Sequence, residues 1–102
     1  MSNPDLSQTV GFVWDAGNSR KNVDKHGVRQ SEAEEPFFNA PLIVVQDARH
    51  SGQEDRFHAL GSTQRGRRLH ITFTLRAGGT QIRVISARDM SSKERAYYAQ
   101  SP

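Results

Sequence analysis

The chain has 102 residues, no cysteine and a formal net charge of +3 at pH 7. The absence of cysteine excludes disulfides, thiolate nucleophiles and zinc–cysteine sites, and we expect a cytoplasmic location. No apolar run reaches the roughly 20 residues that cross a bilayer, and the first residues lack the features of a secretory signal. We expect a disordered tail over residues 1–9 and a single domain over residues 10–100.

The charges are distributed unevenly along the chain. Residues 1–55 hold five Lys or Arg and nine Asp or Glu, a net charge of −4. Residues 56–102 hold nine Lys or Arg and two Asp or Glu, a net charge of +7. This asymmetry favours a polyanion or a strongly acidic protein as the partner, because summed charge governs long-range attraction. A solvated basic surface without a function is the alternative.

The first elements are a strand and two helices. Apolar residues over 10–15 indicate a short strand, and the next helix ends at Gly27, the usual residue for a left-handed C-cap. Lys25 and His26 lie in the last turn of this helix, where cations favour the helix dipole.

A second short helix is predicted over residues 31–38. Ser31 is its expected N-cap and Glu34, three residues later, its capping-box partner. Pro36 weakens this prediction because it removes a backbone donor one turn into the helix.

Strands are predicted over residues 42–47, 56–62 and 68–76, with a loop over 48–54. A fourth strand follows Gly78-Gly79, a pair that favours a two-residue primed turn. This turn sets Arg76 opposite Gln81, Leu75 opposite Ile82, Thr74 opposite Arg83 and Phe73 opposite Val84.

The register separates an apolar face from a second face that is polar and basic. The apolar face holds Leu69, Ile71, Phe73, Leu75, Ile82 and Val84. The second face holds His70, Thr72, Thr74, Arg76, Gln81 and Arg83, with Arg88 beyond it. Because the apolar face must be covered, we expect the helices to pack there and to leave the second face open.

A final helix is predicted after Ser91, whose capping-box partner is Glu94. The order strand, helix, helix, four strands, helix indicates an α+β domain. Its sheet is expected to be mainly antiparallel, with four to five strands and helices on one face.

The second face suits RNA. Guanidinium groups bind phosphate oxygens bidentately, and RNA supplies its own nucleophile, the 2′-hydroxyl. Cleavage then needs a base, an acid and a cation, but no metal ion or cofactor. The proton-transfer candidates are Glu54, His50, His58 and His70.

The position of His58 relative to His70 depends on the turn between their strands. A two-residue loop at Arg65-Gly66 places the two imidazoles on opposite faces, whereas one extra residue places them on the same face. No His-x-x-x-His pair or Gly-rich phosphate loop occurs in the sequence, so neither a metal site nor a nucleotide site is indicated.

Four segments in order resemble the BrnT toxins of bacterial type II toxin-antitoxin systems: "FVWDAGNSRKNVDKHGV", "HSGQEDRFHALG", "GRRLHITFTLR" and "RVISARDMSSKERAYY". The resemblance runs from about Phe12 to Tyr98. It implies a RelE-like fold and a metal-independent ribonuclease that inhibits translation. It also implies a BrnA-like antitoxin that covers the toxin and binds operator DNA through a ribbon-helix-helix part.

The family's motifs match separate parts of this chain. They match Lys25-His26-Gly27, then Glu54, Arg56 and Phe57, then Arg83 through Arg88, and finally Lys93, Glu94, Arg95 and Tyr98. The chain departs from the family pattern at Asp55, where Glu is usual, and at Pro36, where an apolar residue is frequent.

The resulting hypothesis assigns catalysis to Arg83, Arg88, Glu54 and His70, and RNA binding to Lys25, His26, Arg56 and Arg76. The alternative is a non-catalytic partner of the antitoxin in an operator-binding repressor complex. A free-standing nucleic-acid-binding module is disfavoured because Phe73 faces the core and the two tyrosines lie on a helix.

Overall fold

The computed structural model describes residues 6–47 and 54–101. Its elements are β1 (Gly11–Val13), α1 (Ala16–His26), α2 (Gln30–Glu34), η1 (Glu35–Phe38), β2 (Ile43–Asp47), β3 (Arg56–Ser62), β4 (Arg68–Arg76), η2 (Ala77–Gly79), β5 (Gln81–Asp89) and α3 (Ser92–Ala99). Among the described helices, none is long and apolar enough to cross a membrane.

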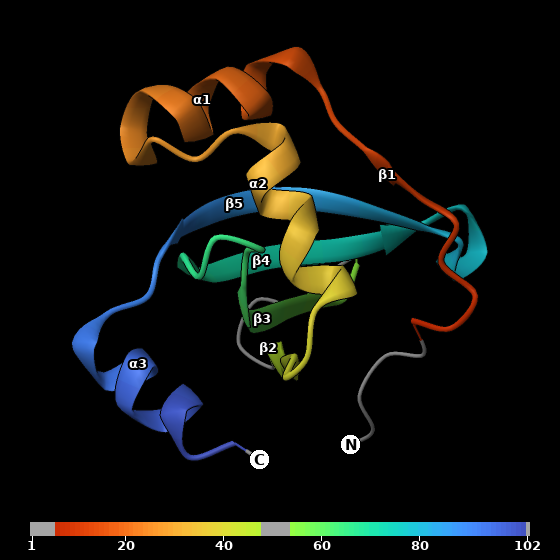
Figure 1. Cartoon of the computed structure of the whole chain (residues 1–102). Helices are drawn as coiled ribbons and strands as arrows, with labels where there is room; N and C mark the ends of the chain where they lie inside the picture. Colours follow the sequence, from red (N-terminus) through yellow and green to blue (C-terminus); the bar gives the residue numbers. More distant parts are fainter. Residues whose placement is uncertain (1–5, 48–53, 102) are drawn as a thin grey trace.

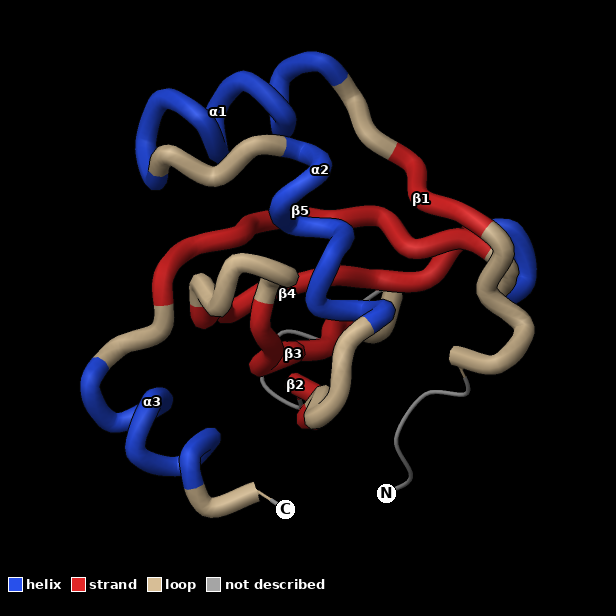
Figure 2. Tube along the Cα trace, in the orientation of Figure 1, coloured by secondary structure: helices blue, strands red, loops and turns tan. Residues whose placement is uncertain are grey.

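The strands form one sheet in the order β1-β5-β4-β3-β2 (Figure 2). β1 pairs with β5 in parallel, and the other three pairings are antiparallel. The expected α+β architecture with a mainly antiparallel sheet is confirmed. Figure 1 shows α1 and α2 together on one side of β5 and β4, whereas α3 lies apart from them and contacts β3.

The core lies between the sheet and the helices α1, α2 and η1. The predicted apolar face of β4 and β5 is confirmed, because five of its six residues are buried and Leu75 packs against them. Phe73 is central, since its ring contacts the ring of Phe37 at 5.1 Å and that of Phe57 at 5.5 Å between centroids. Burial of this face is the main stabilising contribution to the fold.

The predicted register of the last hairpin is confirmed at all four pairs. Gly78 and Gly79 have φ angles of +67° and +92°, as a primed turn requires. Further along, Val84 pairs with Phe73 and Ser86 with Thr72, so Ile85 is an extra residue, a β-bulge.

The bulge changes which side chains of β5 point to the second face. Before it, Arg83 lies on the second face, and after it Arg88 lies on that face, opposite His70. Two arginines five residues apart therefore share one face, which strict alternation would not allow.

The turn between β3 and β4 contains three residues, 64–66, closed by a hydrogen bond from Thr63 N to Arg67 O of 2.8 Å. Gly66 takes a positive φ of +88° there. In the resulting register His58 pairs with Thr72 and Leu60 with His70, so both histidines lie on the same face.

Of the three helix ends predicted from capping residues in the sequence, two are confirmed. α1 ends before Gly27, which has a φ of +64°, as predicted. The capping box of α3 is also confirmed: Ser91 Oγ accepts from Glu94 N at 3.2 Å, and Glu94 Oε1 accepts from Ser91 N at 2.9 Å.

The predicted cap of the second helix is wrong. α2 begins at Gln30, and the carboxylate that closes its first turn is Glu32, which accepts from Arg29 N at 3.1 Å. Glu34 is engaged elsewhere, because its carboxylate accepts from Trp14 Nε1 at 2.8 Å. Pro36 lies in the first turn of η1, where a missing backbone donor costs little.

Arg67 joins the helical layer to the sheet. Its guanidinium donates to Asp89 from Nε at 2.7 Å and from an amino nitrogen at 3.1 Å, and another amino nitrogen donates to the carbonyl of Gly27 at 2.9 Å. The hydrogen bonds to Arg67 lower the pKa of Asp89. The end of α1 is thereby held beside the end of β5.

Part of the expected tail is described. Leu6 packs against the core, and Thr9 N donates to Leu6 O at 3.1 Å. The tail stays a prediction for residues 1–5, which lie outside the described residues, as does the loop over 48–53.

A substitution at Gly61 tests how η1 packs on the sheet. A Cβ at this position would lie 2.7 Å from Pro36 Cβ and 3.2 Å from Leu42 Cδ1. We expect Gly61→Ala to lower the free energy of unfolding by about 1–3 kcal/mol, because the overpacked proline must move. Urea denaturation measures this, with Gly11→Ala as the control, since nothing lies within 4 Å of its Cβ. Equal stability of the two variants would contradict the described packing.

Candidate functional site

The second face carries polar and charged side chains from four strands. Cross-strand pairing gathers them into three rows that run from β2 to β5. The first row holds Asp47, Arg56, Thr74 and Arg83, the second holds Val45, His58, Thr72 and Ser86, and the third holds Ile43, Leu60, His70 and Arg88.

His58 occupies the centre of this face. Its Nε2 lies 2.8 Å from Asp47 Oδ2, and its Nδ1 lies 3.1 Å from Thr72 Oγ1. The Asp47 carboxylate is only 9% exposed. In a neutral ring, a carboxylate in this position favours the proton on Nε2, which leaves Nδ1 to accept from the Thr72 hydroxyl.

His70 lies directly beside His58, with 4.9 Å between the ring centroids. Burial, followed by the charge of Arg88, lowers the pKa of His70 from its ordinary 6.5 to about 4. His70 is therefore neutral at pH 7 in the free protein.

Arg88 is held by the first turn of α3. Its two amino nitrogens donate to the two carboxylate oxygens of Glu94 at 2.8 and 3.0 Å, and one also donates to Asp89 O at 3.0 Å. These hydrogen bonds are the first cause that lowers the pKa of Glu94 to about 2. Of the five N–H groups of a guanidinium, the contacts with described residues use three.

His58, His70, Arg88 and Glu94, together with Asp47 and Thr72, form what we call the histidine cluster. His70 Nε2 lies 3.9 Å from Glu94 Oε2, so the cluster is continuous from β2 to α3. It combines an oriented imidazole, a neutral, partly buried imidazole and a guanidinium on one surface.

The other predicted arginine site lies further along β5. Arg83 donates to Asp15 Oδ2 at 2.9 Å, at the start of α1. Five residues with one bulged residue separate Arg83 from Arg88, which is roughly 13 Å along the strand. The histidine cluster therefore contains Arg88 but not Arg83.

Glu54 and Arg76 form an exposed ion pair, with 3.3 Å between Oε1 and the guanidinium. Arg76 ends β4, and His70 lies six residues before it, roughly 20 Å along the strand. The structure thus brings His70 and Arg88 together, places Arg56 opposite Asp47 at the edge of the cluster, and places Glu54 and Arg76 toward the other end of the face.

Thr74 does not belong to the accessible surface, contrary to the sequence-based expectation. It is 1% exposed, and its hydroxyl donates to the carbonyl of Asp55 at 2.6 Å. The chain that enters β3 covers it, which alternation along one strand cannot reveal.

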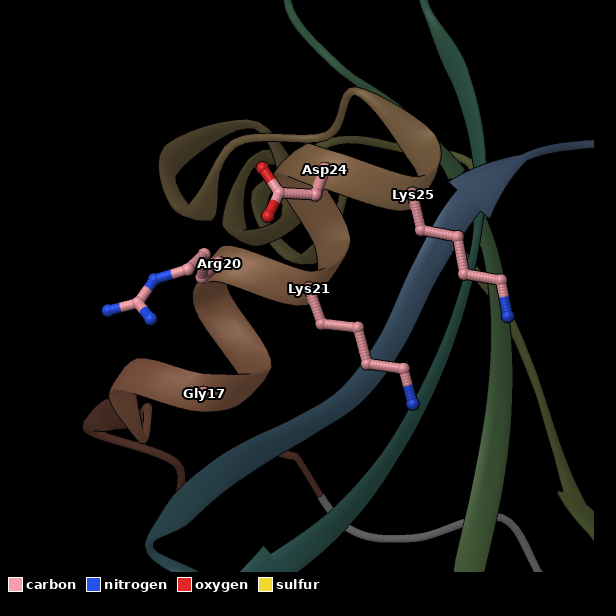
Figure 3. Close-up of a pocket in the computed structure, with 5 residues that line it drawn as sticks. All are labelled: Gly17, Arg20, Lys21, Asp24 and Lys25. Atoms are coloured by element: carbon pink, nitrogen blue, oxygen red, sulfur yellow. The ribbon is translucent and has the colours of Figure 1, made fainter.

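Lys25 and His26 lie on α1, next to the end of β5. Asn22 Oδ1 accepts from Ala87 N at 3.2 Å, which fixes α1 beside the residue before Arg88. Figure 3 shows Lys21 and Lys25 pointing in the same direction from α1, away from the side of Arg20 and Asp24. Lys21 was not singled out from the sequence, although its i, i+4 spacing to Lys25 was a usable signal.

Sequence reasoning missed two members of the histidine cluster. Asp47 ends a predicted strand, but its contact with His58 depends on the β2–β3 register. Glu94 was assigned a capping role and a place in a family motif, but no role in the site. His50 lies outside the described residues. Within the described part of the chain, no three His, Asp or Glu side chains are grouped to hold a metal ion.

Comparisons with known proteins give a family and a fold. A family model described as "Ribonuclease toxin, BrnT, of type II toxin-antitoxin system" matches residues 14–94. The chain is similar to the crystal structure of the Brucella abortus ribonuclease toxin BrnT, with a TM-score of 0.62 and 26% sequence identity over 82% of this chain and 100% of that chain. The search of curated proteins gave no match. The resemblance inferred from the four sequence segments is thereby confirmed.

The lowered pKa of His70 predicts how stability changes with pH. Because the folded pKa of about 4 lies below the ordinary 6.5, the unfolded chain binds a proton that the folded chain does not. The free energy of unfolding should fall as the pH drops from 6.5 toward 4. Between pH 6.5 and 5 we expect a loss of about 1 kcal/mol, since solvent at the rim screens the effect.

Urea denaturation across this range, in wild type and His70→Gln, measures the loss. The variant should show a smaller slope. The window stops at pH 5 because Glu94, whose pKa is lowered from 4.5 to about 2, adds its own loss of stability below that pH. Parallel curves for the two proteins would show that His70 is not responsible.

Proposed function

The chain belongs to the BrnT family of ribonuclease toxins of type II toxin-antitoxin systems, and from this premise we propose that it cleaves RNA at the histidine cluster. In this proposal cleavage is endonucleolytic, uses no metal ion or cofactor, and inhibits translation. The observation that carries it is the cross-strand pair of His70 and Arg88 with His58 against it, which joins proton-transfer groups and a phosphate ligand.

Attack of the 2′-hydroxyl on phosphorus requires a base beside that hydroxyl. The proposed base is His58 Nδ1, which lies 3.1 Å from the Thr72 hydroxyl in the free protein. In this proposal the Thr72 hydroxyl turns away and the substrate hydroxyl donates to Nδ1 in its place. Asp47 holds the opposite nitrogen at 2.8 Å and stabilises the imidazolium as the proton arrives. The bond from phosphorus to the 5′-oxygen breaks as the new bond forms. The proposed acid that gives this leaving oxygen its proton is His70, in the protonated form that a bound phosphate favours.

The negative charge that builds on phosphorus requires a cation. Arg88 is the proposed ligand of the scissile phosphate, because its guanidinium is fixed beside both imidazoles and keeps its charge at any relevant pH. Arg83, Arg56, Arg76 and Lys25 are proposed to bind the RNA on either side of that phosphate. The catalytic roles expected for Arg83 and Glu54 stay predictions, and their distance from His70 favours a binding role.

Neutralisation is proposed to come from a BrnA-like antitoxin encoded with the toxin. The membership in a type II toxin-antitoxin family supports such a partner. In the proposed complex the antitoxin covers the second face, and its ribbon-helix-helix part binds operator DNA.

A second candidate function is that of a non-catalytic partner in the repressor complex. One observation favours it: both predicted phosphate ligands are engaged by carboxylates of the chain itself, Arg83 by Asp15 and Arg88 by Glu94. In that case the second face would contact an acidic protein segment and no RNA would be cut.

Controlled expression separates the two functions. We expect the wild-type chain to arrest growth and fragment cellular RNA, and the Arg83→Ala, Arg88→Ala double variant to do neither. Loss of Arg88 alone should lower cleavage of an RNA oligonucleotide about a hundredfold or more, because a charge-stabilising group is removed. The matched control is the Arg20→Ala, Arg29→Ala double variant, which removes two exposed arginines of the helical layer, on the other side of the sheet from the cluster.

Far-UV circular dichroism should show that all three proteins are folded. A harmless wild type that leaves RNA intact would reject the ribonuclease and favour the repressor partner. Equal losses of cleavage in both double variants would reject the proposed site.

Asp47 and His58 should act as one unit. We expect His58→Gln to lower the cleavage rate about a hundredfold or more and Asp47→Asn to lower it about tenfold or more. The doubly substituted protein should be no slower than His58→Gln, since Asp47 acts only through His58. Single-turnover cleavage of an oligonucleotide measures the rates. If the double variant were slower than His58→Gln by the full factor that Asp47→Asn causes alone, Asp47 would not act through His58.

A further inference from the structure

We propose that the hollow between β2, β3, β4 and α3 binds one unstacked RNA base next to the phosphate at Arg88, with Tyr97 as the stacking platform. This inference rests on the proposed function, because it names a substrate subsite beside the histidine cluster. It assigns a role to surface that the cleavage chemistry does not use.

The hollow has a volume of about 250 Å³ and mostly apolar walls. Three aliphatic side chains and the imidazoles of His58 and His70 line it from the sheet. Glu94 and Tyr97 line it from α3. The aliphatic residues are Ile43, Val45 and Leu60.

Two of the lining side chains leave large apolar groups exposed to solvent. Tyr97 is 58% exposed and Val45 is 48% exposed. Large apolar groups that remain in water beside a charged cluster favour an interaction site, because their burial by a ligand is stabilising. The ligand should therefore present a flat apolar surface and carry an anionic group.

A nucleotide of single-stranded RNA has both features. Its base offers a π-face of any sequence for stacking on an aromatic ring, and its phosphate is the ligand that Arg88 suits. Arg88 and Glu94 are joined by two hydrogen bonds, and Glu94 also lines the hollow, so the phosphate position and the base position are adjacent. This charge complementarity favours RNA as the occupant.

The neighbouring tyrosine explains how Tyr97 is positioned. Tyr98 is 6% exposed, and its hydroxyl donates to Pro41 O at 2.6 Å and accepts from Ser62 Oγ at 3.1 Å. Tyr98 thus fixes α3 on the sheet, while Tyr97, one residue before it, points to the hollow. The sequence-based argument that both tyrosines are unavailable because they lie on a helix does not hold for Tyr97.

Binding of a non-cleavable RNA tests the subsite without depending on catalysis. The probe is a 2′-O-methyl oligonucleotide that carries the fluorescent base 2-aminopurine at one position, moved along the chain in a series. At one position the wild type should quench the fluorescence, because the base stacks. Tyr97→Ala should lose that quenching and raise Kd about tenfold, whereas Tyr97→Phe should stay within about twofold of wild type.

The control variant is Phe38→Ala, which removes an aromatic side chain of similar exposure, 76%, from the opposite part of the molecule. It should leave both Kd and quenching unchanged. A second probe carries an abasic site at the quenched position. The wild type should bind this probe about tenfold more weakly than the intact RNA. Tyr97→Ala should bind the two RNAs equally well, because it has already lost the stacking platform.

The outcomes separate the subsite from the ribonuclease. Cleavage by the wild type with no effect of Tyr97→Ala on binding or quenching would overturn the subsite and leave the ribonuclease standing. Tyr97-dependent stacking without any cleavage would support the subsite and overturn catalysis. If Tyr97→Ala weakens only the complex with the antitoxin, the hollow is a protein-docking site and the proposal fails.

Discussion

The arrangement of the second face depends on one extra residue in β5. Without the bulge at Ile85, alternation from Ile82 and Val84 would turn Arg88 toward the buried face, where an unpaired guanidinium is very costly. With it, Ala87 takes the buried position and is fully covered, while Ser86 and Arg88 face Thr72 and His70. The same residue that interrupts the sheet therefore creates the histidine cluster, as bulges near functional sites often do.

The fold was predictable wherever local chemistry decides the structure. Gly78-Gly79 set the register of the hairpin, Gly27 ended α1, and Ser91 with Glu94 began α3, since each depends on residues at most a few positions apart. The bulge left a signal as well. Val84 and Ile85 are consecutive apolar residues, followed by the polar Ser86, so the alternation changes phase there.

The site was less predictable because its contacts join distant segments. Asp47 reaches His58 only through the β2–β3 register, for which the sequence offers no tight turn, and Glu94 reaches Arg88 only because the chain turns back after β5. The predicted cap of the second helix was wrong for the same reason. A local capping rule selected Glu34, whereas a contact with Trp14, twenty residues away, engages that carboxylate.

The ion pairs of the second face bear on how a phosphate would bind. In the proposed function Arg88 would exchange the carboxylate of Glu94 for a phosphodiester of the same charge, so the guanidinium would remain paired, and Glu94 would keep its hydrogen bond from Ser91 N. The exchange would also bring a second anion beside His70. Burial, followed by the charge of Arg88, lowers the pKa of His70 in the free protein, and the charge of Glu94 opposes them. An added phosphate raises the pKa of a neighbouring imidazole, so substrate binding favours the protonated form that leaving-group departure needs.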